Sequence, residues 1–196
     1  MASLHFYYSA MNAGKSTILL QADYNYKERG MDTILFVPKV DNRYGAGKIT
    51  SRIGLSAEAI AFDKTFDLFL YTNNAMRSND KIKCVLVDEA QFLTKDQVIQ
   101  LGDITDNWHI PVLAYGLRTD FCGEPFEGSK YLLAQADILL EVKTICHCGK
   151  KATMNLRIDA EGNALTKGAQ IEIGGNDRYV AVCRKHFKSA TGGGSP

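Results

Sequence analysis

The sequence lacks any long apolar run, and this absence excludes one class of protein. No stretch approaches the roughly 18 consecutive apolar residues that a membrane-spanning helix needs. The N-terminus also lacks the charged and apolar regions of a secretory signal peptide. We therefore expect a cytoplasmic protein without a membrane partner.

An excess of charge of one sign is also missing. The chain has 23 Lys and Arg against 22 Asp and Glu, which gives a formal net charge of +1. Non-specific nucleic-acid binding usually depends on a basic surface, so we expect no nucleic-acid partner. Apolar residues make up 45% of the 196 residues, which is enough for the buried core of one domain with a small appendage.

Cysteines are few and their number, five, is odd, so internal disulfides cannot pair them all. In a reducing compartment, clustered cysteines more often hold metal than form disulfides. Two clusters occur here, Cys-His-Cys at 146–148 and Cys-Arg-Lys-His at 183–186. Together they offer a Cys₃His set suited to tetrahedral, structural zinc, formed by Cys146, Cys148, Cys183 and His186. The alternatives are His147 as the fourth ligand and a set of unliganded thiols.

Apolar runs alternate with amphipathic stretches up to about residue 145. We expect strands at residues 4–8, 33–37, 83–87, 111–115 and 138–142. We expect helices at 15–29, from Thr94 onward with Gln97 completing a capping box, and at 130–136, with Gly30 ending the first helix. Residues 41–54 are expected to form a loop. This alternation predicts βαβ units and a mostly parallel sheet flanked by helices, the α/β class.

Residues 9–17 match the pattern of a phosphate-binding loop with one exception. The pattern is G-x-x-x-x-G-K-[ST] between a strand and a helix. Gly14, Lys15 and Ser16 fill its last positions, whereas Ser9 stands where the first Gly is expected. Backbone N–H groups can surround a phosphate, the lysine can reach the β- and γ-phosphates, and the serine can ligate Mg²⁺. The alternative is a plain turn, but the strand before and the helix after favour a P-loop (RecA-like) fold.

Two acids follow the apolar segment 83–87. Asp88 fits the carboxylate that organises Mg²⁺ at the C-terminal end of a neighbouring strand. Glu89 is adjacent, so its side chain points elsewhere, where it can accept a proton from an attacking hydroxyl. The alternative for both is a pair of solvated acids at a strand end.

Other residues have weaker assignments. Arg52, in the loop after the second strand, is either a phosphoryl-contacting guanidinium or a solvated surface residue. Leu117 and Phe121 follow a buried strand, where α/β folds place ligand-contacting loops, although core packing is the default. The segment 174–179, Gly-Gly-Asn-Asp-Arg-Tyr, is either a plain turn or a backbone surface that a ligand can approach.

Taken together, these motifs resemble the thymidine kinases of the cytosolic type II family, and most closely its enterobacterial members. The resemblance covers about residues 4–188 in order. The segments that carry it are Ser-Ala-Met-Asn-Ala-Gly-Lys-Ser-Thr (9–17), Ser-Arg-Ile-Gly (51–54), Val-Asp-Glu-Ala-Gln-Phe (87–92), Tyr-Gly-Leu-Arg-Thr-Asp-Phe (115–121), Cys-His-Cys-Gly (146–149) and Ile-Gly-Gly-Asn-Asp-Arg-Tyr (173–179). Two departures are Ser9 in place of glycine and C-x-C with a final histidine in place of paired C-x₂-C motifs.

The resemblance implies transfer of the ATP γ-phosphate to the 5′-hydroxyl of thymidine, and of deoxyuridine, with inhibition by dTTP and a homotetrameric assembly. It makes Glu89 the general base and Arg52 the residue that steadies the phosphoryl group. It implies Mg²⁺ held by Ser16 and Asp88. ATP is then bound by Ser9, Ala10, Met11, Asn12, Ala13, Gly14, Lys15, Ser16, Thr17, Asp88, Glu89, Ala90 and Gln91. Thymidine is bound by Met11, Phe92, Leu117, Phe121, Thr153, Gly174 and Tyr179, within a zinc-tied loop, the lasso, at 149–182.

The expected organisation is therefore a P-loop domain at residues 1–145, a zinc-stapled lasso subdomain at 146–188 and a flexible tail at 189–196. Two competing hypotheses remain. Asp-Glu-Ala-Gln at 88–91 resembles the acidic motif of helicase-type ATPases, which suggests a nucleic-acid motor. Against it, the chain is short for two motor domains and its net charge is near zero. The other is a nucleotide-sensing scaffold that binds ATP and phosphorylates nothing.

Overall fold

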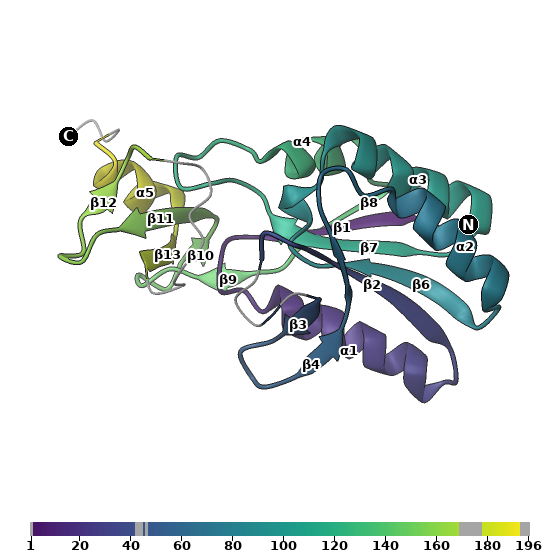
Figure 1. Cartoon of the computed structure of the whole chain (residues 1–196). Coiled ribbons are helices and arrows are strands. Elements are labelled where there is room, and N and C mark those ends of the chain that lie inside the picture. The colour runs from purple at the N-terminus through teal and green to yellow at the C-terminus, as the bar shows by residue number, and fades with distance from the viewer. Residues whose placement is uncertain (1, 42–44, 46, 169–177, 193–196) are drawn as a thin grey trace.

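A computed structural model describes residues 2–41, 45, 47–168 and 178–192. Within these residues a six-stranded sheet forms the centre of the molecule, and all its strand pairs are parallel (Figure 1). In spatial order its strands are β5 (Ile60–Phe62), β2 (Asp32–Pro38), β6 (Ile82–Val87), β7 (Val112–Leu117), β1 (Leu4–Ser9) and β8 (Ile138–Glu141). The predicted parallel α/β sheet is confirmed.

Helices cover both faces of this sheet (Figure 1). One face carries α1 (Lys15–Glu28), and the other carries α2 (Leu68–Ser78), α3 (Lys95–Trp108) and α4 (Glu127–Gln135). Successive strand residues point to opposite faces, so Phe36 belongs to the apolar core under α2–α4 and Leu35 to the core under α1. Burial on both faces explains why these strands are almost continuously apolar.

Two predicted helix ends, at Gly30 and Thr94, are confirmed, whereas the helix expected at 130–136 begins earlier, since α4 spans Glu127–Gln135. Thr94 accepts a hydrogen bond from the Gln97 amide, and the Gln97 side chain accepts one from the Thr94 amide, which completes the capping box of α3. Gly30 follows α1 with φ of 72°, a left-handed conformation that glycine adopts without a steric penalty.

The segment expected to be a loop at 41–54 contains a short strand, so that expectation is wrong in part. Strand β3 (Lys48–Thr50) pairs antiparallel with β4 (Ser56–Glu58), and Ile49 is buried in the core under α1. Three residues are too short to show a period in the sequence, and the strand exists because its partner and α1 cover it. Helix α2 was likewise not predicted.

The C-terminal part of the chain forms a smaller unit beside the sheet (Figure 1). It contains β9 (Thr144–Ile145), β10 (Lys151–Ala152), β11 (Met154–Ile158), β12 (Ala164–Leu165), β13 (Tyr179–Val182) and helix α5 (Arg184–Ala190). Strand β11 lies between β12 and β13 in an antiparallel sheet. Helix α5 was not predicted, and it extends two residues beyond position 188, where the tail was expected to begin.

No helix in the described part of the chain is both long and apolar enough to cross a membrane.

Candidate active site

The segment between β1 and α1 has the backbone of a phosphate-binding loop. Strand β1 ends at Ser9 and α1 begins at Lys15. Asn12 and Gly14 have φ of 63° and 84°, so the chain turns sharply before the helix. The amides of the first helical turn have no partners within the helix, and with the helix dipole they favour an anion. The strand–loop–helix setting predicted for residues 9–17 is therefore present.

Ser9, which replaces the usual glycine, contacts the loop lysine. The Lys15 ammonium donates hydrogen bonds to the Ser9 hydroxyl at 2.9 Å and to the Ala10 carbonyl at 3.4 Å. Ser9 in turn donates to the Ala10 carbonyl at 2.6 Å. Lys15 is buried at the end of the loop, where its charge is available to a phosphate group.

Ser16 and Asp88 are joined by a hydrogen bond from the serine hydroxyl to the carboxylate at 2.9 Å. Asp88 directly follows β6, but β7 lies between β6 and β1. The expectation that the carboxylate lies on a strand adjacent to β1 is therefore wrong, because β7 separates the two strands. Asp88 still reaches Ser16, because the carboxyl ends of all parallel strands lie at the same edge of the sheet. A hydroxyl and a carboxylate are the oxygen ligands that Mg²⁺ accepts, so this pair fits that ion.

Asp88 lies in a buried environment that favours its protonated form. Burial raises the pKa of the Asp88 carboxyl to about 7, and repulsion from Glu89 adds to the effect. The hydrogen bond from Ser16 and the charge of Lys15 oppose it without cancelling it. A nearby cation would stabilise the ionised form of this buried carboxylate.

Glu89 is held by Gln91. Glu89 has a left-handed backbone with φ of 47°, which is uncommon for a residue with a side chain and is found disproportionately at functional sites. It precedes a short 3₁₀ helix, η1 (Ala90–Phe92). The Gln91 carboxamide donates to a Glu89 carboxylate oxygen at 2.5 Å and accepts from the Leu117 amide at 3.0 Å. Gln91, expected at the ATP site, therefore connects Glu89 to the end of β7.

The residues expected to contact thymidine come from several elements. Met11 lies in the phosphate loop, Leu117 ends β7, and Phe92 packs edge-on against Phe126 at 5.9 Å between ring centroids. Phe121 is 1% exposed, so within this structure it is core, with the Arg157 guanidinium 5.4 Å from its ring centroid.

Of the remaining expected thymidine contacts, Tyr179 lies in the antiparallel sheet, Thr153 lies between β10 and β11, and one residue falls outside the described residues. Tyr179 stands opposite Arg157 in the β11–β13 pair. The Thr153 carbonyl accepts a hydrogen bond from Arg118 at 3.2 Å, and its amide donates to Val182. Gly174 lies outside the described residues, as does the segment 174–177.

Arg52 is exposed and lies in the turn at 51–54 between β3 and β4. Among the described residues, no hydrogen bond or ion pair joins it to Lys15, Asp88 or Glu89. In this conformation, no contact that the structure describes between Arg52 and these residues supports its expected role on the phosphoryl group.

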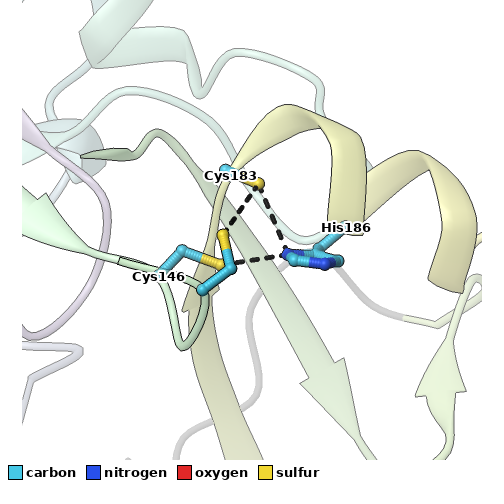
Figure 2. Close-up of side chains that lie close together, drawn as sticks. Cys146, Cys183 and His186 are labelled. Atoms are coloured by element: carbon cyan, nitrogen blue, oxygen red, sulfur yellow. Dashed lines mark hydrogen bonds between the residues drawn. The ribbon is translucent and has the colours of Figure 1, made fainter. Parts of the chain in front are cut away.

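The four predicted metal ligands converge although 40 residues separate the first from the last. The three sulfurs and one histidine nitrogen all lie within 4.8 Å of one another. The His186 Nδ1 atom is 3.3 Å from the Cys146 sulfur and 3.4 Å from the Cys183 sulfur, and Figure 2 shows these side chains pointing toward one another. The Cys148 and Cys183 sulfurs are 3.9 Å apart.

The separations of these atoms fit tetrahedral zinc. Zn–S bonds near 2.3 Å and Zn–N bonds near 2.0–2.1 Å imply ligand separations of about 3.5–3.8 Å. Burial alone would raise the pKa of the Cys146 thiol, but hydrogen bonds, first from the Cys148 and Cys183 backbones and then from His186, lower it to about 5. A thiolate at neutral pH is the form that binds metal. The ring of His147, the rival ligand, lies tilted against that of His186 with centroids 4.2 Å apart.

Sequence reasoning missed Asn155 and Arg118, which join the smaller sheet to the site. Asn155 on β11 accepts a hydrogen bond from the Met11 amide and donates one to the Thr119 carbonyl. Arg118 donates to the Thr153 carbonyl, and its own amide donates to Ser9. No local pattern predicts the side-chain bonds of these two residues, because the partners lie 35 to 144 positions away.

Comparison with known proteins agrees with this geometry. The family model described as thymidine kinase matches residues 2–187. The chain is 66% identical to a thymidine kinase of Coxiella burnetii (strain RSA 493 / Nine Mile phase I) over 96% of both chains. It is 61% identical to a thymidine kinase of Legionella pneumophila (strain Lens), over 98% of this chain and 92% of that one. A thymidine kinase of Vibrio vulnificus (strain YJ016) is 59% identical over 98% of this chain and all of its own length.

Proposed function

This chain belongs to the thymidine kinase family, and from that premise we propose that it transfers the γ-phosphate of ATP to the 5′-hydroxyl of thymidine, giving dTMP and ADP. One observation carries the proposal most directly. Ser16 of the phosphate loop hydrogen-bonds to Asp88, and Glu89 follows directly in the chain. Phosphate-binding, metal-binding and proton-accepting groups therefore meet at one edge of the sheet.

The chemistry assigns each group one task. The thymidine 5′-oxygen attacks the γ-phosphorus, the bond from that phosphorus to the β,γ-bridging oxygen breaks, and ADP leaves with that electron pair. Glu89 accepts the proton of the 5′-hydroxyl, and Gln91 holds its carboxylate in place. Lys15 and the loop amides stabilise charge on the phosphates. Such reactions depend mainly on positioning and electrostatics, which these residues supply.

Ser16 and Asp88 are the residues that would hold Mg²⁺. When bound with ATP, the ion neutralises charge on the β- and γ-phosphates. We assign the remaining ATP contacts to the loop residues 9–17 and to residues 88–91, and keep Arg52 as a candidate contact to the transferred group once the turn at 51–54 moves.

Thymine binding is assigned to Met11, Phe92, Leu117, Phe121, Thr153, Gly174 and Tyr179. Met11 is hydrogen-bonded to Asn155 and Phe121 lies against Arg157, both on β11, so residues of this set from the P-loop domain meet the smaller sheet, which supports one shared site. The lasso at 149–182 would close over the base, with zinc at Cys146, Cys148, Cys183 and His186 tying its two ends. Phe121 is buried, so it contacts the base only if the lasso shifts.

Several finer properties belong to the same proposal. They are activity on deoxyuridine, inhibition by dTTP, a homotetramer and a cytoplasmic location. Exposed apolar side chains on the edge strand β8 and on α1 support association with further copies; they include Ile138, Leu139, Leu140, Ile18 and Tyr24. The cysteines are unpaired and suit a reducing compartment. We divide the chain into a P-loop domain (1–145), a lasso subdomain (146–188) and a tail (189–196).

The test is incubation of the zinc-loaded protein with thymidine and MgATP, with dTMP and ADP measured by chromatography. Equal amounts of both products support the proposal, and no dTMP from folded protein rejects it. ATP binding without a product would favour the nucleotide-sensing scaffold, and DNA-stimulated ATP hydrolysis with steep salt dependence would favour the motor.

The sharper version replaces Glu89 with Gln. Turnover is expected to fall about 10²–10⁴-fold because a general base contributes that much, while the Kd for MgATP changes little. Glu28→Gln, on the exposed far end of α1, is the control and should match wild type. Turnover within about tenfold of wild type would show that Glu89 is not the base.

A further inference from the structure

We propose that Asn155 is a positioning residue that fixes the phosphate loop to the zinc-stapled sheet, so that the ATP and nucleoside sites are held in one geometry. The inference rests on the proposed kinase function for its meaning, although its central measurement does not require phosphoryl transfer.

Asn155 joins three parts of the molecule through one carboxamide. Its oxygen accepts a hydrogen bond from the Met11 amide of the phosphate loop at 2.8 Å. Its nitrogen donates to the Thr119 carbonyl, in the loop after β7, at 3.0 Å. The residue itself belongs to β11 and pairs with Ala181 of β13. A side chain with both a donor and an acceptor is needed to make both bonds at once.

Burial makes the loss of these two Asn155 hydrogen bonds costly. Asn155 is 1% exposed, so water cannot easily replace the carboxamide as a partner. Met11 and Thr119 present backbone groups, which carry a large penalty when they are buried without partners. An apolar side chain at position 155 would therefore release the first half of the phosphate loop from its support.

The support continues to the metal site. Strand β13 ends at Val182, whose carbonyl accepts from the Thr153 amide, and the next residue is the metal ligand Cys183. Zinc, β13, β11 and Asn155 thus form a connected path to the Met11 amide. A metal that is remote from the phosphates can in this way determine how rigidly they are held.

Loss of this link has a distinctive signature. A residue that only stabilises the smaller sheet would affect melting temperature and thymidine binding, but not ATP binding. Asn155 is expected to affect ATP as well, because its partner Met11 lies in the phosphate loop. Small displacements of such loops produce large losses of rate.

The experiment compares the full-length, zinc-loaded protein with Asn155→Leu, which has a similar volume and no polar atoms. The dissociation constant of a magnesium complex of a non-hydrolysable ATP analogue is measured by calorimetry, along with zinc content and melting temperature. We expect Asn155→Leu to keep one zinc per chain and to bind the analogue about tenfold more weakly. Both KM values for ATP and thymidine should rise in the activity assay.

Two further variants complete the design. Asn155→Thr offers one hydroxyl that can accept from Met11 and donate to Thr119, so it should recover most of the ATP affinity. Asn107→Leu is the control, because Asn107 is exposed on α3 and its side chain donates to the Asp103 carbonyl. If Asn155→Leu does not fold, Asn155→Ala replaces it and is judged by the same outcomes.

The proposal is overturned if the folded leucine variant binds the analogue within twofold of wild type. It is also overturned if its weaker binding accompanies loss of zinc, or if Asn155→Thr is no better than Asn155→Leu. Failure of the kinase proposal looks different: wild-type protein would bind the analogue and yield no dTMP, and the tether would still be judged by the dissociation constants.

Discussion

Two adjacent acids at the end of β6 illustrate how single residues acquire different tasks. Asp88 is 4% exposed and hydrogen-bonded to Ser16. Glu89 is partly exposed, has a left-handed backbone and is bound by Gln91. The buried acid suits a metal ligand, and the partly exposed acid held by Gln91 suits a base. The left-handed backbone at Glu89, directly after Asp88, separates the two side chains.

Replacement of Gln91 by Met tests the orientation of Glu89. Met has a similar shape but cannot donate to Glu89 or accept from Leu117, so turnover should fall about 10–100-fold with little change in KM for ATP. Gln97→Met is a matched control, since Gln97 is equally buried at 2% but donates to Asp63 and Phe66 in the fold. It should lower the melting temperature and leave turnover intact below that temperature. Equal turnover losses in both variants would contradict a specific role for Gln91.

The raised pKa of Asp88 predicts a pH-dependent stability in magnesium-free buffer without chelator. The folded state raises this pKa from 3.8 to about 7, so it holds the proton more tightly than the unfolded chain. The resulting stabilisation is complete below about pH 4 and is lost as pH rises through about 7. Relative to Asp88→Asn, wild type should therefore lose about 3 kcal/mol of unfolding free energy between pH 5 and pH 8, measured by urea unfolding. If the unfolding free energies of the two proteins change with pH in the same way, the raised pKa is not that of Asp88.

At the scale of elements, α4 and the short helix η1 are packed almost without space between backbones. A Cβ added at Gly128 of α4 would lie 2.4 Å from the Ala90 carbonyl oxygen and 2.9 Å from that of Leu93. Because η1 carries Gln91, the position of α4 also determines where Glu89 is held. The close backbone contact between α4 and η1 therefore connects a peripheral helix to the site.

A pair of glycine substitutions tests this packing. Gly128→Ala is expected to destabilise the protein by about 1–3 kcal/mol, as overpacking does, and to lower turnover by displacing η1. Gly102→Ala, in α3, meets nothing within 4 Å and should stabilise the protein by about 0.5–1 kcal/mol, since alanine favours a helix. Urea unfolding and the kinase assay report both effects. Unchanged stability of Gly128→Ala would show that the helices separate easily.

On the scale of the whole molecule, zinc is expected to connect two distant parts of the chain. The ligands at 146–148 and 183–186 lie at the two ends of the lasso. Among the described residues, the small core beneath them has few buried apolar side chains, which include Leu156, Val182 and Phe187. A core of this size gives limited stability without a metal, so binding of zinc and folding of this unit should be coupled.

Replacement of Cys183 by Ser should therefore reduce zinc below one per chain and abolish thymidine phosphorylation. The six-stranded sheet has its own larger cores, so most of the circular dichroism signal should remain. Cys122→Ser is the control, because Cys122 is exposed and outside the metal cluster. Zinc is measured by release to a chromogenic chelator. Full zinc content in Cys183→Ser would exclude this ligand set.

The sequence by itself determined the features that depend on neighbouring residues. The α/β class and the parallel strands follow from the alternation of apolar runs with amphipathic stretches. The capping box of α3 follows from Thr94 and Gln97. The phosphate loop follows from Gly14, Lys15 and Ser16. The Cys₃His set was also predictable, since its members lie in two short clusters at 146–148 and 183–186. Short-range hydrogen bonds and ligand chemistry leave their pattern within a few positions.

Only the tertiary structure decided which distant groups meet. It placed β7 between β1 and β6, formed β3 against α1, and brought Gln91 to Leu117 and Asn155 to Met11. The Asn155–Met11 bond spans 144 positions, and no local periodicity encodes such a distance. These contacts exist because whole elements pack to bury apolar surface, and the polar groups that packing brings together must then find partners.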